Sequence, residues 1–394
     1  MSGIQFKNEL VISDKEMQRR WQAVRQEMKK RKVDFLVMQN SHSIMHGCVR
    51  WFTDLKVGDG YPVSVLFPVD GELTVITHGP REQQPLGPIF GQPVRGIKKH
   101  ITVPVVLSLS YGRTMEADHL IAEMSGKKNP TVGLVGMPYM SSSMYKQLTG
   151  KMNSAKFEDW TDIMDSIRVI KSEEEIGFVR NTCLLEDALW EYALTQIKPG
   201  ASNFSVRRNV IRKSMDMGVE VYNIGIGSAP AGKPARMVPD DRVLQDGDQI
   251  VMLLETDGPG GFWGELSRTA CIGKMPQQLQ EQFDISCQAQ KISAEMLTPR
   301  TPAAEIMKAS NNFLISKGYP GESRIFAHGQ GYDMVEVPCL DTLDPMIIKA
   351  NMFVAVHPEA KSDKAHGWVC DGFLVKNSGP AERLHTTPQK IFLV

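Results

Sequence analysis

The stretch QIVMLLETDGPGGFWGELSRTACIG, residues 249–273, decides the fold of this 394-residue chain. Two apolar runs flank a glycine-rich turn. Glu255 ends the first run and Glu265 begins the second. Short apolar runs of this kind are typical of buried strands. A carboxylate at the end of a buried strand is costly unless it is paired or exposed. We therefore expect two adjacent strands that present both carboxylates to one cavity, as metal ligands or as an acid and a base.

Three later stretches also deliver a polar side chain from an apolar or glycine-rich run. They are FAHGQGYD (326–333) with His328, MFVAVH (352–357) with His357, and GWVCDGFLV (367–375) with Cys370. The glycines that follow His328 let a ligand approach the backbone closely. Each stretch alone is a weak signal, but together they predict that this half of the chain carries the chemistry.

The composition restricts the class of protein. The 45 basic residues balance the 45 acidic ones, which disfavours a nucleic-acid partner. No apolar run reaches the length that crosses a bilayer, and the N-terminus lacks the apolar core of a signal peptide. The six cysteines are scattered without a CxxC pair, so a disulfide framework is not expected. We expect a cytoplasmic protein that acts on a small molecule and binds neither nucleic acid nor membranes.

Two domains are expected. Residues 1–165 alternate helices and strands, with strands at 34–40 and 131–136 and a hairpin at 63–79, as in a small α/β domain. A long helix then begins after Ser172, which has capping-box spacing to Glu175. The remaining chain combines strands with further helices in an α+β arrangement. The helices are expected at 202–217, 276–297 and 303–317.

Five stretches, in this order, resemble the creatinase, aminopeptidase P and methionine aminopeptidase superfamily, whose catalytic domain has the pita-bread fold of the M24-like peptidases. They are SIRVIKSEEEIGFVRNTCLLEDALWEYALTQIKPG (166–200), residues 238–273, FAHGQG (326–331), KANMFVAVHPEA (349–360) and GWVCDGFLVKNSGPAERL (367–384). The resemblance implies an α+β fold in which a pita-bread domain, 166–394, follows a creatinase-type N-terminal domain, 1–165.

The chain departs from the superfamily at the metal positions. The peptidases hold two metals with Asp, Asp, His, Glu and Glu. The matching residues here are Glu255, Glu265, His328, His357 and Cys370. Two hard divalent cations need several carboxylates, and this set has only two. The departure favours a site without metal or cofactor, as in creatinase and ectoine hydrolase. A single zinc or similar ion is the alternative.

The resulting hypothesis is a metal-independent hydrolase of a carbon–nitrogen bond in an amidine, guanidine or amide. Hydrolysis needs a base and an acid, for which Glu255 and Glu265 are the candidates. His328 and His357 would carry protons or stabilise an oxyanion. The alternatives are a mononuclear-metal Xaa-Pro dipeptidase-like enzyme or a lyase of the same fold, and a non-catalytic binding protein.

Further residues are candidates for binding the substrate. Arg236 would pair with a substrate carboxylate. Glu336 follows His328 by eight residues, and Cys370 stands at the last of the five positions that match the metal ligands. In the superfamily, the N-terminal domain of a partner subunit often closes the site. The resemblance therefore implies a homodimer and adds three candidates from the N-terminal domain, namely His46, Arg50 and Trp51.

Overall fold

The computed structural model describes residues 5–45, 47–79, 82–84, 86–104, 115–238, 240–341 and 343–394. It divides into two compact units. The smaller is Ile12–Arg168, and the larger combines Met1–Val11 with Val169–Val394. The division thus falls at the end of helix α5 (Thr161–Arg168) rather than at 165. It also assigns the N-terminal segment to the C-terminal unit, which the sequence analysis did not expect.

The smaller unit is a mixed sheet with helices, as predicted. Its strand order is β4-β5-β3-β2-β1-β6-β7, and the expected strands and hairpin are present. Its strands are β1 (Phe35–Asn40), β2 (Val63–Pro68), β3 (Leu73–His78), β4 (Glu82–Gln84), β5 (Ile97–Val103), β6 (Thr131–Val135) and β7 (Lys156–Asp159). Its other helices are α1 (Asp14–Arg31), α2 (Gly47–Thr53), α3 (Met115–Met124), η1 (Met137–Tyr139) and α4 (Ser142–Lys151).

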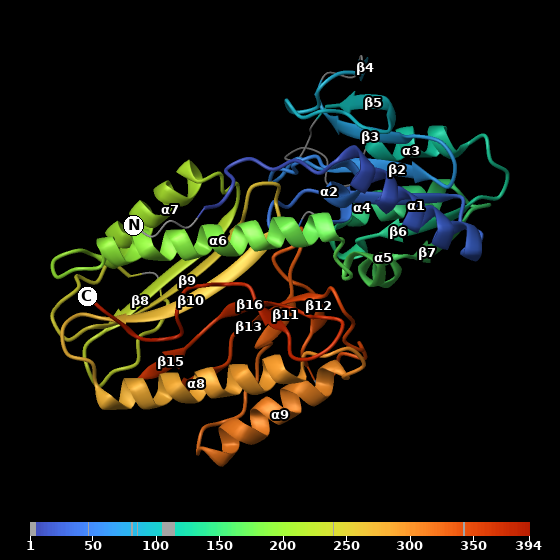
Figure 1. The fold of residues 1–394 in the computed structure, drawn as a ribbon. Helices are drawn as coiled ribbons and strands as arrows, with labels where there is room; N and C mark the ends of the chain where they lie inside the picture. The colour runs from blue at the N-terminus through green and yellow to red at the C-terminus, as the bar shows by residue number, and fades with distance from the viewer. Residues whose placement is uncertain are drawn as a thin grey trace. The chain divides into compact units, whose positions relative to one another are not determined.

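The larger unit places two layers of strands between two pairs of helices (Figure 1). Its helices are α6 (Glu173–Gln196), α7 (Asn203–Asp216), α8 (Gln277–Met296) and α9 (Ala303–Ser316). The first sheet, β18-β10-β9-β8, comprises β8 (Tyr222–Ala229), β9 (Gln249–Asp257), β10 (Trp263–Cys271) and β18 (Phe392–Leu393). The second sheet, β12-β11-β13-β16-β17, comprises β11 (Ala327–Gly329), β12 (Glu336–Cys339), β13 (Phe353–Val356), β16 (Asp371–Leu374) and β17 (Glu382–Arg383). A short ladder joins β14 (Glu359–Lys361) to β15 (His366–Trp368).

Strand β9 shows why the sequence folds into layers. Met252 and Leu254 point into the core that α6 and α7 cover. Leu253, on the opposite face, packs with Trp368 from β15. Successive side chains of a strand alternate between its two faces, so Glu255 lies on the face of Leu253. The strand therefore buries its apolar side against the helices and delivers Glu255 to the space between the two sheets.

Helix α6 begins where the sequence predicts. The Ser172 hydroxyl accepts a hydrogen bond from the Glu175 backbone, and the Glu175 carboxylate accepts one from the Ser172 backbone. This reciprocal capping satisfies amide groups that have no partner within the helix. Among the described helices, none is long and apolar enough to cross a membrane.

The C-terminal segment ties the helices of the larger unit to its strands. His385 Nε2 lies 2.9 Å from a Glu186 carboxylate oxygen on α6. The other oxygen of Glu186 accepts a hydrogen bond from the backbone of Thr256, next to Glu255. The backbone of Thr387 donates to Asp187, and β18 pairs with β10. The last residues of the chain therefore hold α6, β9 and β10 together.

Arg268 and Asp371 form an ion pair between the two layers. Arg268 Nη2 lies 2.6 Å from Asp371 Oδ1, and neither side chain is exposed to solvent. The guanidinium also donates to four backbone carbonyl groups, those of Ser267, Cys370, Thr387 and Pro388. Every side of this buried cation therefore has a polar partner, as burial of a charge requires.

Replacing Arg268 by methionine should strongly destabilise the larger unit. The change leaves the Asp371 carboxylate buried without its main cation, which costs about 3–5 kcal/mol. Arg180→Met is the matched control, because Arg180 pairs with Glu382 at 2.7 Å while both side chains are about 40 % exposed. The control should cost about 0–1 kcal/mol. Urea denaturation measures both values, and equal losses would contradict the central role of Arg268.

Candidate active site

The structure brings five of the predicted residues together between the two sheets. Glu255 and Glu265 lie directly opposite each other on β9 and β10. His328 Nε2, from β11, lies 3.5 Å from Glu265 Oε2. His357 follows β13, and its ring centroid lies 5.3 Å from that of His328. The Cys370 thiol donates to the backbone oxygen of Glu265 at 3.4 Å. Five strands or strand ends thus converge on one buried, polar cluster.

The contact between Glu265 and His328 defines the chemistry of this cluster. His328 Nδ1 lies 3.0 Å from the backbone oxygen of Gly329, which can only accept, so Nδ1 carries a proton. In the neutral ring, Nε2 then has a lone pair that faces Glu265 Oε2. That oxygen accepts no hydrogen bond from any described residue. Two lone pairs at this distance repel each other unless a cation or a proton lies between them.

The two carboxyl groups have opposite protonation behaviour. Burial, reinforced by the nearby charge of Glu265, raises the pKa of Glu255 well above its usual range. Burial also acts to raise the pKa of Glu265, but His357, His328 and Cys370 outweigh it and hold that pKa at about 2. Environments that separate two carboxyl pKa values in this way assign one group as acid and the other as anion.

Two amide side chains hold Glu255. Asn223 Nδ2, from β8, donates to one oxygen at 2.8 Å, and Gln330 Nε2 donates to the other at 3.3 Å. Sequence analysis missed both residues. Gln330 lies inside the glycine-rich motif that drew attention to His328, so its position was a usable signal. Asn223 lies in a strand that the sequence analysis did not assign.

The other two site residues are electrically neutral at pH 7. Burial lowers the pKa of His357 to about 4 and raises the pKa of the Cys370 thiol well above its usual range. A protonated thiol that donates to a carbonyl group is a poor metal ligand. Cys370 therefore packs beneath Glu265 without adding charge to the cluster.

The loop that carries His328 rests on a second buried ion pair. Lys171 Nζ lies 2.8 Å from Glu336 Oε2, and both side chains are about 4 % exposed or less. The other Glu336 oxygen accepts from the Asp333 backbone at 3.3 Å. A Cβ atom on Gly331 would lie 2.5 Å from that oxygen, so the close approach requires glycine. Glu336 thus supports the loop, and its expected role in substrate binding stays a prediction.

The remaining substrate-binding candidates are not part of this cluster. Arg236 is exposed, and its segment passes so close to β8 that a Cβ atom on Gly227 would collide with it. Arg50 and Trp51 are buried within the smaller unit, each about 2 % exposed, which does not favour a contact across a dimer interface. His46 lies outside the described residues. Their roles in binding stay predictions.

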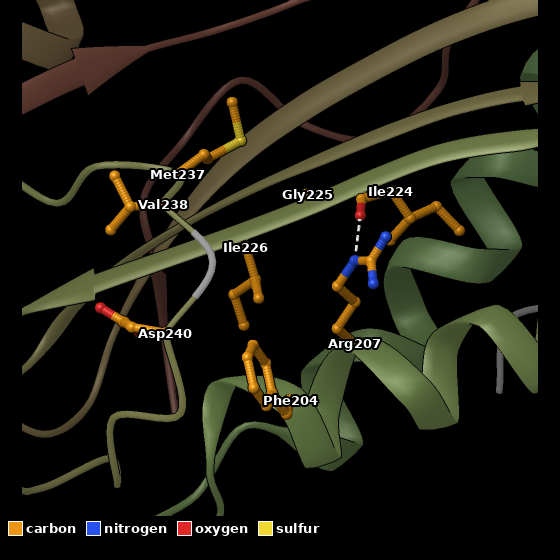
Figure 2. Close-up of a pocket in the computed structure, with 8 residues that line it drawn as sticks. All are labelled: Phe204, Arg207, Ile224, Gly225, Ile226, Met237, Val238 and Asp240. Carbon is orange, nitrogen blue, oxygen red and sulfur yellow. Dashed lines mark hydrogen bonds between the residues drawn. The ribbon is translucent and has the colours of Figure 1, made fainter.

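A separate pocket lies along the edge of β8, between α7 and the residues that follow Arg236 (Figure 2). Its volume is about 220 Å³, and Arg207 Nε spans one side by donating to the Ile224 backbone oxygen at 2.6 Å. It is lined by Phe204, Arg207, Ile224, Gly225, Ile226, Met237, Val238 and Asp240. None of the described candidate residues is among them. The carboxylate–histidine chemistry therefore lies at Glu255 and Glu265 and not in this pocket.

The donor set of the cluster fits one divalent cation. Glu265, His328 and His357 each place one oxygen or nitrogen within 4.8 Å of the other two. Glu265 supplies a full negative charge and an oxygen without a hydrogen-bond partner among the described residues. Burial raises the pKa values of Glu255 and of the Cys370 thiol well above their usual ranges, which favours the protonated forms of both groups.

The layered fold and the buried carboxylate–histidine cluster define a hydrolase with the pita-bread fold. The model of metallopeptidase family M24 matches residues 178–379, and the chain belongs to this family. An Xaa-Pro dipeptidase of Pyrococcus furiosus is 24 % identical over 273 residues, which cover 67 % of this chain and 76 % of the relative. An Xaa-Pro dipeptidase of Pyrococcus horikoshii is 24 % identical over 65 % of this chain and 72 % of the relative.

Solved structures of low sequence identity share the fold. The X-Pro aminopeptidase from Thermotoga maritima has a TM-score of 0.81 and 17 % identity, and covers 95 % of this chain and 99 % of its own. The Xaa-Pro dipeptidase from Bacillus anthracis has a TM-score of 0.77 and 17 % identity, with 96 % and 100 % covered. The superfamily, the fold class and the assignment as a hydrolase of carbon–nitrogen bonds are thereby confirmed.

Two expectations are wrong. Membership of a metallopeptidase family contradicts both the metal-independent hydrolase and the absence of a metal cofactor. The comparisons give no support to a creatinase-like or ectoine-hydrolase-like activity. The number of carboxylates was a poor guide, because it does not show that Glu265 Oε2 and His328 Nε2 face each other at 3.5 Å.

Glu336→Gln should show whether Glu336 supports the loop that carries His328 or binds the substrate. The change leaves Lys171 buried without its anion, so we expect a loss of about 3–5 kcal/mol in the free energy of unfolding. The KM of the folded enzyme should stay within about twofold, because no binding contact is removed. Lys171→Met removes the other partner of the same ion pair, and it should lower the stability by a similar amount while leaving KM unchanged. Unchanged stability with a large rise in KM would instead identify Glu336 as a substrate residue.

Proposed function

We propose that the protein is a metal-dependent peptidase of the Xaa-Pro dipeptidase type, with one divalent ion bound at Glu265 and His328. The proposal adopts one alternative of the sequence analysis. It is supported most directly by the opposed lone pairs of Glu265 Oε2 and His328 Nε2 at 3.5 Å, in a chain of a metallopeptidase family. The names of the relatives supply the substrate class, a small peptide with proline after the scissile bond.

The protonated carboxyl group of Glu255 is the proposed general acid. Hydrolysis before proline releases a secondary amine, whose nitrogen must gain a proton as the carbon–nitrogen bond breaks. Glu255 lies opposite Glu265, and burial beside that anion raises its pKa well above the usual range, which favours the protonated form. Asn223 and Gln330 fix its orientation through the two oxygens. Each turnover then requires water to return a proton to Glu255.

Glu265 is the proposed anionic anchor of the site. Its carboxylate stays ionised, and the strand pairing of β9 and β10 fixes its position relative to Glu255. The bound ion would polarise the scissile carbonyl group and lower the pKa of a water molecule, which is the chemistry that such ions supply. The buried surroundings strengthen each of these electrostatic effects.

Removal of the metal should abolish the activity. The purified protein is expected to hold about one divalent ion per chain by elemental analysis, because the cluster offers one ionised carboxylate. Release of proline from Xaa-Pro dipeptides should stop after treatment with a chelator and resume when Mn²⁺, Co²⁺ or Zn²⁺ is restored. Cleavage of an amidine or a urea that is insensitive to the chelator would contradict the proposal.

Glu265→Gln should lower kcat/KM by at least about a hundredfold, because the amide keeps the shape of the side chain but loses its charge. Glu295→Gln is the matched control, since Glu295 is exposed on α8, where it pairs with Lys291 at 3.9 Å. The control should leave proline release unchanged. Full activity of Glu265→Gln would exclude Glu265 as the anchor of the site.

The proposal also covers the cellular compartment and the oligomeric state of the enzyme. We infer that it acts in the cytoplasm as a homodimer, on the grounds given by composition and by the resemblance. Sedimentation at micromolar concentration tests the dimer, and a monomer that is fully active would contradict it.

A further inference from the structure

Arg324 contacts both the side chain and the backbone of His357. Arg324 Nη1 lies 3.1 Å from His357 Nδ1, and Arg324 Nη2 lies 3.1 Å from the His357 backbone oxygen. A guanidinium group has only donors and keeps its proton throughout the accessible pH range. His357 Nδ1 must therefore be the acceptor in this contact.

This contact fixes which ring nitrogen of His357 carries the proton. A neutral imidazole has one N–H group and one lone pair. Because Arg324 occupies the lone pair at Nδ1, the proton is at Nε2. A histidine that binds a metal uses the lone pair of one ring nitrogen for the metal. Its other ring nitrogen carries the proton and donates a hydrogen bond to an acceptor. His328 shows that arrangement, since its Nδ1 faces the carbonyl oxygen of Gly329.

The position of Arg324 is itself held by several groups. Its Nη2 lies 3.1 Å from Glu322 and 3.8 Å from Glu359, and its guanidinium lies 5.8 Å from the centre of the Trp368 ring. Glu359 is fixed in turn by His366 at 2.8 Å. Trp368 also donates to the backbone oxygen of His357 at 3.2 Å. The orientation of the His357 ring is thus set by a connected network rather than by one exposed side chain.

We propose that Arg324 is a positioning residue that prevents His357 from binding the metal and makes it a hydrogen-bond donor in the site. The ion is then bound by Glu265 and His328, and the Nε2–H group of His357 is available to an anionic oxygen. The two histidines, with ring centroids 5.3 Å apart, have different roles because their Nδ1 atoms face opposite partners, a carbonyl oxygen and a guanidinium. The proposal rests on the metal site of the proposed function.

Titration with Co²⁺ tests this assignment without using catalysis. The visible absorption of the bound ion and competition with a chromophoric chelator report the dissociation constant. His328→Ala should weaken Co²⁺ binding by at least about a hundredfold, because it removes a ligand. His357→Ala should stay within about threefold of the unchanged protein, because no ligand is lost. His357→Phe keeps the ring volume without nitrogen and should give the same result if the alanine variant folds poorly.

Changing Arg324 tests its role directly. In Arg324→Met the lone pair of Nδ1 loses its partner, the proton can move to Nδ1, and Nε2 becomes able to bind the ion. Co²⁺ should then bind about tenfold more tightly, and the absorption spectrum should change because a nitrogen ligand is added. Loss of a positive charge also favours a cation, so the double variant Arg324→Met with His357→Ala is required. It should lose the gain if the gain comes from His357.

The outcomes separate the two proposals. If the unchanged protein binds no Co²⁺, the proposed function fails and the assignment of His357 fails with it. If the unchanged protein binds Co²⁺ and His357→Ala weakens binding as much as His328→Ala does, His357 is a ligand and only the role of Arg324 is overturned. A gain in Arg324→Met that persists in the double variant would also overturn that role, because it would be purely electrostatic.

Discussion

The buried ion pair of Arg268 and Asp371 is the interaction on which the catalytic unit depends. Arg268 belongs to β10 of the first sheet and Asp371 to β16 of the second, so the pair joins the two layers at their centre. The Arg268 guanidinium also donates hydrogen bonds to the backbone carbonyl groups of Cys370 and of Thr387 in the C-terminal segment. Because a buried charge has little tolerance for altered geometry, the pair fixes the spacing between the sheets. The separation of Glu265 from His328 follows from that spacing.

Much of the fold could be predicted from the chain itself. The apolar runs around Glu255 and His357, the hairpin at 63–79 and the capping box at Ser172 each correspond to an observed element. These signals depend on residues near one another in the chain. Strand β8 was missed because glycines interrupt its apolar pattern. The attachment of the N-terminal segment to the larger unit was missed because it depends on contacts between distant residues, such as Lys7 with Asn181.

The sequence predicted which residues form the candidate site, but not their protonation states or their capacity to bind a metal. Polar residues that end buried strands pointed to all five side chains of the cluster. Their protonation depends on neighbours that the motifs do not contain. Asn223 and Arg324 lie 32 and 33 residues from the groups they contact, and nothing in the local sequence marks them. The metal was misjudged because a count of charges does not reveal that Glu265 Oε2 and His328 Nε2 face each other.

The attachment of the chain's last residues has a consequence for how the protein is made. The smaller unit is continuous, from Ile12 to Arg168, so it can fold while synthesis continues. The larger unit is not continuous in the same way, since His385 and Thr387 bind α6 and β18 pairs with β10. It can close only after the segment that carries these residues has left the ribosome. Until then, β10 lacks its parallel partner β18, and Glu186 on α6 lacks its contact with His385.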